Sequence, residues 1–152
     1  MRRWRAKPVK SWRKSNVASH EQVAERLMNV RIALLASPAI TDVRVIQEQA
    51  LGDVGYFRIR GKLANADEVL FMERFRWQNG AVAVEKYSFH WQNPEGKLIR
   101  RWDNAPHHPE IGSFPHHLHD ADETNIQPHG PVDAFEILRI IGEAFLESRR
   151  PD

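Results

Sequence analysis

The chain has 152 residues, of which 41% are hydrophobic and 28% charged, with a net charge of +2 and no cysteine. This length suits one domain with a buried core. The lack of cysteine excludes disulfides and thiolate metal sites and favours a reducing compartment, for which we expect the cytoplasm. No apolar run approaches the roughly 20 residues of a membrane span, and no apolar segment follows the basic N-terminus as in a secretory signal, so we expect no membrane partner.

Charge is unevenly distributed along the chain. Residues 1–18 carry seven basic and no acidic side chains, so the remaining 134 residues sum to −5. We expect a flexible basic arm over residues 1–18, which could bind nucleic acid or an acidic partner, and a single α+β domain over residues 19–152. The alternative is a solvated extension without a function. The candidate nucleic-acid-binding residues of the arm are Arg2, Arg3, Arg5, Lys7, Lys10, Arg13 and Lys14.

Two segments have the signals of amphipathic helices. The first begins at a capping box formed by Ser19 and Gln22 and ends at Ser37-Pro38. The second begins at a capping box formed by Asp133 and Glu136 and ends before Pro151. Apolar residues recur in both at helical spacing. The predicted buried stripes are Val23, Leu27, Val30 and Leu34, then Ala134, Ile137, Leu138, Ile141, Ala144 and Phe145.

Between these helices the hydrophobic period changes to two. Five segments rich in β-branched and aromatic residues are separated by turn signals, of which Asn79-Gly80 is the strongest because both central positions of a type I′ turn need a positive φ. Short loops between successive strands indicate a five-stranded antiparallel meander. The predicted strands are Val43–Ala50, Tyr56–Leu63, Val69–Trp77, Val82–Trp91 and Leu98–Trp102.

The turns also suggest a register for the last three strands. If Gln78 faces Ala81 and Gln92 faces Lys97, each face of the sheet mixes polar and apolar residues, so each must be partly covered. This register places Glu73, Lys86 and Asp103 side by side. Such a group could perform acid–base or metal-assisted hydrolysis, or it could be an ordinary ladder of cross-strand ion pairs.

The segment after the fifth strand is rich in histidine. Five of the eight histidines lie within residues 107–119, together with two prolines, and no hydrophobic period runs through residues 103–130. We therefore expect a long loop, and loops longer than about 12–15 residues in compact domains are usually functional or disordered. The fold prediction is an N-terminal helix, the antiparallel sheet, this histidine-rich loop and a C-terminal helix.

Three interpretations of the histidines remain open. Imidazoles titrate near neutral pH and suit general acid–base chemistry. An extended His117-Leu118-His119 would point both rings to one side, and Asp103, Glu110 or Asp120 could complete a metal site. The third interpretation is that the rings only hold the loop together. Because no recognised zinc-ligand spacing is present, we expect no metal and no cofactor.

Three runs carry a resemblance to a known family, namely Tyr87–Gln92, Leu98–His108 and Phe114–His119. The Arg-x-Asp-Asn-x-Pro-His-His and Pro-His-His-x-His patterns within them resemble those of the TumE family, over roughly residues 40–145. These are small toxin-like proteins of prokaryotic toxin–antitoxin pairs, usually encoded beside a helix-turn-helix antitoxin. The resemblance implies a growth-inhibiting toxin with such a partner, but it implies no mechanism.

The resulting hypothesis is a toxin acting on RNA. Its acid–base candidates are His107, His108, His116, His117 and His119. Asp103 would orient an imidazole, and Arg100 and Arg101 would hold phosphate. The alternatives are a non-catalytic module that binds nucleic acid or protein, and a metal-dependent hydrolase using the histidine-rich loop. The sequence leaves the oligomeric state open and is compatible with a dimer.

Overall fold

The computed structural model describes residues 9–151, with side chains from residue 16 onward, as one antiparallel sheet and two helices. The helices are α1 (Val9–Ala36) and α2 (Ala134–Glu147). Seven strands pair in chain order. They are β1 (Ile40–Leu51), β2 (Val54–Leu63), β3 (Glu68–Gln78), β4 (Ala81–Gln92), β5 (Leu98–Asp103), β6 (His117–Asp120) and β7 (Ile126–Pro128). The α+β prediction is confirmed, whereas the predicted number of five strands is wrong.

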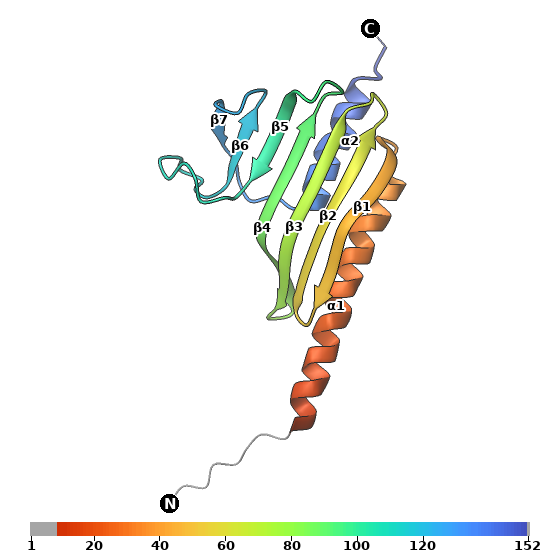
Figure 1. Cartoon of the computed structure of the whole chain (residues 1–152), viewed down its shortest axis with the longest axis vertical. Coiled ribbons are helices and arrows are strands. Elements are labelled where there is room, and N and C mark those ends of the chain that lie inside the picture. The colour runs from red at the N-terminus through yellow and green to blue at the C-terminus, as the bar shows by residue number, and fades with distance from the viewer. Residues whose placement is uncertain (1–8, 152) are drawn as a thin grey trace, which may run out of the picture.

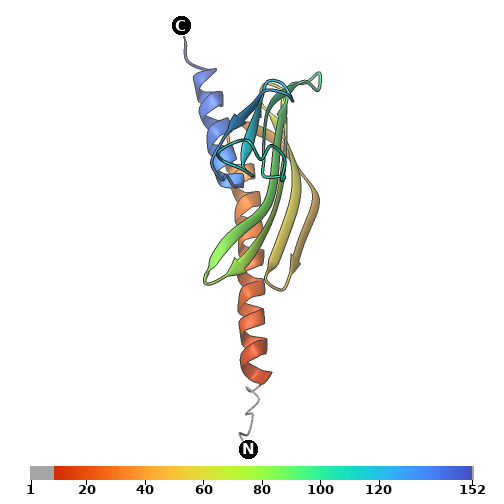
Figure 2. The same cartoon turned by 90° about the vertical axis from the view of Figure 1, so that its left-hand side faces the viewer.

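Both helices cover the same face of the sheet (Figures 1 and 2). The core lies between them and the strands, and its largest fully buried side chains include Trp102, Phe57, Phe71, Phe75 and Phe89. Alternate residues of the strands point to the other face, which we call the outer face. No helix of the described chain is long and apolar enough to cross a membrane, although α1 alone has 28 residues.

The predicted helical stripes are correct, but the start of the first helix is not. The four residues predicted on the buried face of α1 are at most 4% exposed. However, α1 begins at Val9 rather than at the Ser19–Gln22 box. Pro8 directly precedes it, and proline is favoured at a helix start, while lysine, arginine and alanine then propagate the helix. Residues 9–18 of the predicted arm are therefore helical, and residues 1–8 lie outside the described residues.

The second helix begins where the sequence predicts. Asp133 is its N-cap, and the side-chain oxygen Oδ1 accepts a hydrogen bond from the Glu136 backbone N–H at 3.0 Å. The reciprocal half of the predicted capping box is replaced, because the Glu136 carboxylate binds Arg139 instead. This cap fixes the point at which the chain returns from β7 to cover the sheet.

The register differs from the predicted one because β4 contains a bulge. Gln78 faces Ala81 as predicted, and the pairing continues to Phe75 and Val84, but Glu85 is then an extra residue. A bulge of this kind shifts all later pairs by one position. As a result, one face of β4 carries all of its large apolar side chains toward the helices, which explains why a regular alternation gave two mixed faces. These residues are Val82, Val84, Tyr87, Phe89 and Trp91.

The bulge overturns the predicted group of Glu73, Lys86 and Asp103. Glu73 pairs with Tyr87 and is fully buried toward the helices, whereas Lys86 pairs with Arg74 and is exposed. A second irregularity between β4 and β5 places Asp103 opposite Ser88 on the outer face. The three side chains therefore do not meet, and no catalytic or ion-pair role connects them.

Gly55 and Gly142 offer a matched test of this packing. A Cβ on Gly55 of β2 would lie 2.2 Å from Cζ of Phe75, whereas a Cβ on Gly142 of α2 would meet no atom within 4 Å. Gly55→Ala should lower the free energy of unfolding by about 1–3 kcal/mol through overpacking. Gly142→Ala should raise it by about 0.5–1 kcal/mol, because alanine is the better helix former. Urea unfolding of both variants measures the difference, and equal effects would contradict the packing of Phe75 on β2.

Candidate functional site: a histidine cluster on the outer face

The pairing of β5 with β6 brings histidines and a carboxylate together. Asp103 pairs with His117, and Arg101 pairs with His119, so all four side chains point to the outer face. Although neither α1 nor α2 covers this face, Asp103, His117 and His119 are all buried. Part of their cover comes from His108 in the 104–116 loop. Its ring centre lies 5.4 Å from that of His117 and 6.2 Å from that of His119. We call Arg101, Asp103, His108, His117 and His119 the histidine cluster.

The two histidines of β6 have their ring orientation fixed by backbone carbonyls. His117 Nδ1 lies 2.9 Å from the Pro115 carbonyl oxygen, and His119 Nδ1 lies 2.8 Å from the Glu123 carbonyl oxygen. A carbonyl can only accept, so each Nδ1 carries the proton and donates it. In the neutral rings, both Nε2 atoms therefore carry a lone pair, and both lie near Asp103.

Asp103 lies between the two Nε2 atoms. Its Oδ1 lies 3.0 Å from His117 Nε2, and its Oδ2 lies 3.7 Å from His119 Nε2. The shorter distance does not correspond to a hydrogen bond, because His117 Nε2 has no hydrogen-bond partner although it is buried. The carboxylate thus approaches this nitrogen without being aligned with it. The same oxygen, Oδ1, accepts a hydrogen bond from the Ala105 backbone N–H at 3.1 Å.

Arg101 supplies the positive charge beside this carboxylate. Its Nε donates to Asp103 Oδ2 at 3.1 Å, and its Nη2 donates to His119 Nε2 at 3.0 Å. The remaining guanidinium nitrogen, Nη1, binds the Glu123 carboxylate at 2.8 Å. Arg101 is 26% exposed and so reaches from the buried carboxylate to solvent.

Burial is the main cause of the altered pKa of His119. It lowers the pKa of this imidazole, and the nearby Arg101 and His117 lower it further, whereas the bond to the Glu123 carbonyl and the charge of Asp103 oppose the shift. His119 is therefore held in its neutral form to a lower pH than an ordinary histidine. A neutral imidazole can accept a hydrogen bond or bind a metal through Nε2.

His116 lies on the opposite face of the sheet from this cluster. The Tyr87 hydroxyl and His116 Nδ1 form a hydrogen bond at 2.8 Å, and the two rings are stacked. Burial lowers the pKa of His116 and raises the pKa of Tyr87 to about 12, so both groups are neutral at pH 7. His116, which directly precedes β6, is thus separated from His117 and His119, which β6 directs to the outer face.

The other predicted site residues are dispersed. Arg100 points away from the cluster and pairs with Asp120 at 3.3 Å, so the two adjacent arginines face opposite sides. His107 is exposed in the loop, and Glu110 pairs with His108 at 3.2 Å. Lys10, Arg13 and Lys14 lie in the first turns of α1. The candidates Arg2, Arg3, Arg5 and Lys7 lie outside the described residues.

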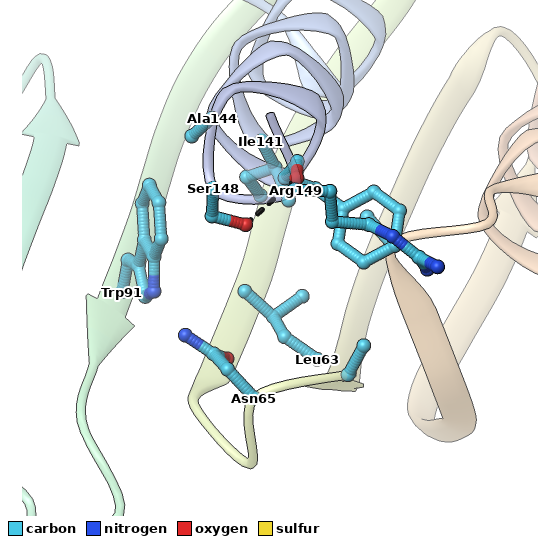
Figure 3. A pocket seen from close by; sticks show the side chains of 10 residues that line it. Leu63, Asn65, Trp91, Ile141, Ala144, Ser148 and Arg149 are labelled. Atoms are coloured by element: carbon cyan, nitrogen blue, oxygen red, sulfur yellow. Dashed lines mark hydrogen bonds between the residues drawn. The ribbon is translucent and has the colours of Figure 1, made fainter. Parts of the chain in front are cut away.

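A cavity of about 280 Å³ lies on the other side of the molecule, between the C-terminal end of α2 and the sheet (Figure 3). Leu63, Trp91 and Ile141 line it, and the Trp91 indole donates to Asp67 at 2.9 Å. Its lining is mainly apolar and includes no histidine or carboxylate. Since the site chemistry lies on the outer face, this cavity is not the candidate active site.

Sequence reasoning missed two parts of the site. The Glu123 residue binds His119 through its carbonyl and Arg101 through its carboxylate, and the Pro115 carbonyl orients His117. Backbone carbonyls carry no signal in the residue types, and Glu123 is recognisable only once β6 is paired with β5. By contrast, the predicted placement of the His117 and His119 rings on one side of an extended segment is confirmed.

The fold and cluster define a small α+β protein whose histidine cluster lies on β5, β6 and the loop between them. The family model described as Toxin TumE matches residues 30–149, and the chain belongs to this family. It is accordingly a toxin component of a toxin–antitoxin system, with an antitoxin as its partner. No match was found among curated proteins or among solved structures.

Proposed function

We propose that this toxin acts in the cytoplasm by cleaving RNA, and that the histidine cluster is its active site. One observation carries the proposal: imidazoles, a carboxylate and a guanidinium from β5, β6 and the intervening loop converge in one cluster. Imidazoles can move protons in phosphodiester cleavage near neutral pH, and a guanidinium can bind the phosphate. The partner is, on this proposal, a helix-turn-helix antitoxin.

The exposure of each side chain in the cluster indicates which residues RNA could contact directly. His117 and His119 are buried, with side-chain exposures of 2% and 5%, so an RNA strand does not reach their rings directly. His108 and Arg101 are 30% and 26% exposed and face the same cluster. On this proposal His108 transfers the proton and Arg101 binds the scissile phosphate, while Asp103 and the two buried histidines form the base of the site.

The basic residues of α1 have a supporting role in the proposal. Lys10, Arg13 and Lys14 lie in the first turns of this helix, which extends beyond the end of the sheet (Figure 1). Lysine and arginine bind the phosphate backbone without sequence preference, and such binding weakens steeply with salt. A helix carrying these charges would hold RNA beside the domain without taking part in its cleavage.

The test compares growth inhibition by variants expressed without the antitoxin. His108→Ala and Arg101→Ala should reduce toxicity and the cleavage of a labelled RNA by the purified chain about 10²-fold or more. His20→Ala is the matched control, since His20 is exposed on α1 and belongs to no part of the site. Circular dichroism should show that all three variants are folded.

Two results would contradict the proposal. A folded His108→Ala chain with full toxicity would remove the acid–base role from the cluster. Growth inhibition by the wild type with intact RNA, in cells and with the purified chain, would favour the alternative of a non-catalytic binding module.

A further inference from the structure

The histidine cluster contains a buried nitrogen that lacks a partner. His117 is 2% exposed, and its Nε2 makes no hydrogen bond, although Asp103 Oδ1 lies only 3.0 Å away. Since Nδ1 donates to the Pro115 carbonyl, the neutral ring directs a lone pair from Nε2. A lone pair and a carboxylate oxygen this close repel each other in a buried site unless a proton or a metal cation lies between them.

We propose that Asp103, His117 and His119 bind one divalent transition-metal ion. The ligands would be the carboxylate and the two Nε2 atoms, and the ligand atoms of the three residues lie within 4.8 Å of one another. Ligands about 2.0–2.2 Å from a tetrahedral zinc ion lie roughly 3.3–3.6 Å apart. The observed separations from Asp103, 3.0 and 3.7 Å, bracket this range closely, so small rotations of the side chains suffice.

The surroundings of the two rings support this assignment. Histidines that bind a metal through one nitrogen usually donate the other N–H to a carbonyl or carboxylate, which fixes the ring and its tautomer. Both His117 and His119 do so, through the carbonyls of Pro115 and Glu123. Two imidazoles with one carboxylate favour zinc, cobalt, nickel or iron over magnesium and calcium, which prefer oxygen ligands.

Arg101 is the group that competes with the ion. Its guanidinium donates to Asp103 Oδ2 and to His119 Nε2, two of the three proposed ligands. An ion at the site would displace these two bonds, and Arg101 would keep Glu123 as its partner. Arg101→Ala should therefore bind the metal at least as tightly as the wild type, because a competing cation is removed. A purely structural hydrogen-bond network would not give this result.

The experiment measures metal uptake by the full chain, purified without a histidine tag and stripped with a chelator. Calorimetry with Zn²⁺ and elemental analysis should show one ion per chain, and Co²⁺ should give visible absorption bands. Mg²⁺ should not compete. His119→Gln and Asp103→Asn should each weaken Zn²⁺ binding by about 10²-fold or more. His20→Ala and Arg101→Ala should retain the ion.

Two outcomes would overturn the site. One is a wild-type chain that binds neither Zn²⁺ nor Co²⁺. The other is Zn²⁺ binding unchanged in both His119→Gln and Asp103→Asn. The readout is metal content rather than toxicity, so the inference does not rest on RNA cleavage. A chain that binds zinc but leaves RNA intact would keep this site and reject the proposed function.

Discussion

Replacing Arg26 by alanine should lower the free energy of unfolding by about 3–5 kcal/mol, because it leaves the buried carboxylate of Glu73 without its cation. Glu73 is fully buried under the helices, and the Arg26 guanidinium donates to its Oε1 at 2.7 and 3.1 Å. The other carboxylate oxygen accepts from the Ala134 backbone N–H at 3.0 Å. One side chain of β3 therefore joins α1 to the first residue of α2.

The stability lost in Arg26→Ala should depend on pH, and the shifted pKa of Glu73 sets the direction of this dependence. Burial raises the pKa of this carboxyl group, and Arg26 is the largest opposing cause, so Arg26→Ala should raise the pKa further. A carboxyl group with a raised pKa in the folded state binds protons more readily there than in the unfolded chain. The free energy of unfolding then falls as pH rises from the unfolded to the folded pKa. Relative to the wild type, Arg26→Ala should show its full loss of stability at pH values above the pKa of Glu73 in the folded state. The loss should be smaller at pH values below the pKa of Glu73 in the unfolded chain.

Urea unfolding at several pH values measures this effect. Arg139→Ala is the matched control, since Arg139 pairs with Glu136 and Glu143 on the exposed face of α2, where ion pairs contribute little to stability. Adding Glu73→Gln to Arg26→Ala should recover part of the loss, because the amide oxygen can still accept from Ala134. If Arg26→Ala cost no more than Arg139→Ala, the buried pair would not hold the helices to the sheet.

Phe89→Ala should also lower the free energy of unfolding by about 3–5 kcal/mol, because the cavity left in the centre of the sheet cannot collapse. Phe89 is 0% exposed and lies between Phe71 on β3 and Trp102 on β5. Its ring packs edge-to-face with Phe71 at 5.9 Å and stacks on Tyr87 at 5.5 Å. The strands on both sides are paired along their length, so neither can move inward to fill the space.

The control uses the same residue type in an exposed position. Phe114 is 44% exposed in the loop before β6, and Phe114→Ala should change the free energy of unfolding by less than about 0.5 kcal/mol. Chemical denaturation followed by tryptophan fluorescence compares the two variants. A loss from Phe89→Ala as small as that from Phe114→Ala would mean that the centre of the core lies elsewhere.

Local signals in the sequence identified most of the elements. The buried stripe of α1, the Asp133 cap of α2 and the turn at Asn79-Gly80 depend on residues close together in the chain, and the structure confirms all three. The family was also recognisable from contiguous motifs, and the match over residues 30–149 confirms it. These features need only a helical or strand period, or a required φ angle, to be visible.

The site depended on contacts that the sequence does not specify. The bulge at Glu85 arises because Val84 and Tyr87 both pack toward the helices, and a regular two-residue alternation cannot satisfy both. Because of this bulge and the irregularity between β4 and β5, Glu73 and Asp103 lie on opposite faces of the sheet, with Asp103 on the outer face. The pairing of β6 with β5 then brought His117 and His119 to Asp103.

The family, the buried stripes of both helices and the start of α2 thus followed from the sequence by itself, whereas the tertiary structure decided which histidines meet. His116 and His117 are neighbours in the chain, but His116 stacks on Tyr87 on the helix-covered face, whereas β6 begins at His117 and brings it to Asp103 on the outer face. Asp103 is separated from His117 by a loop with no regular period, so their distance was set by strand pairing rather than by spacing. The physical reason is that side-chain burial determines register, and register determines which polar groups are brought together.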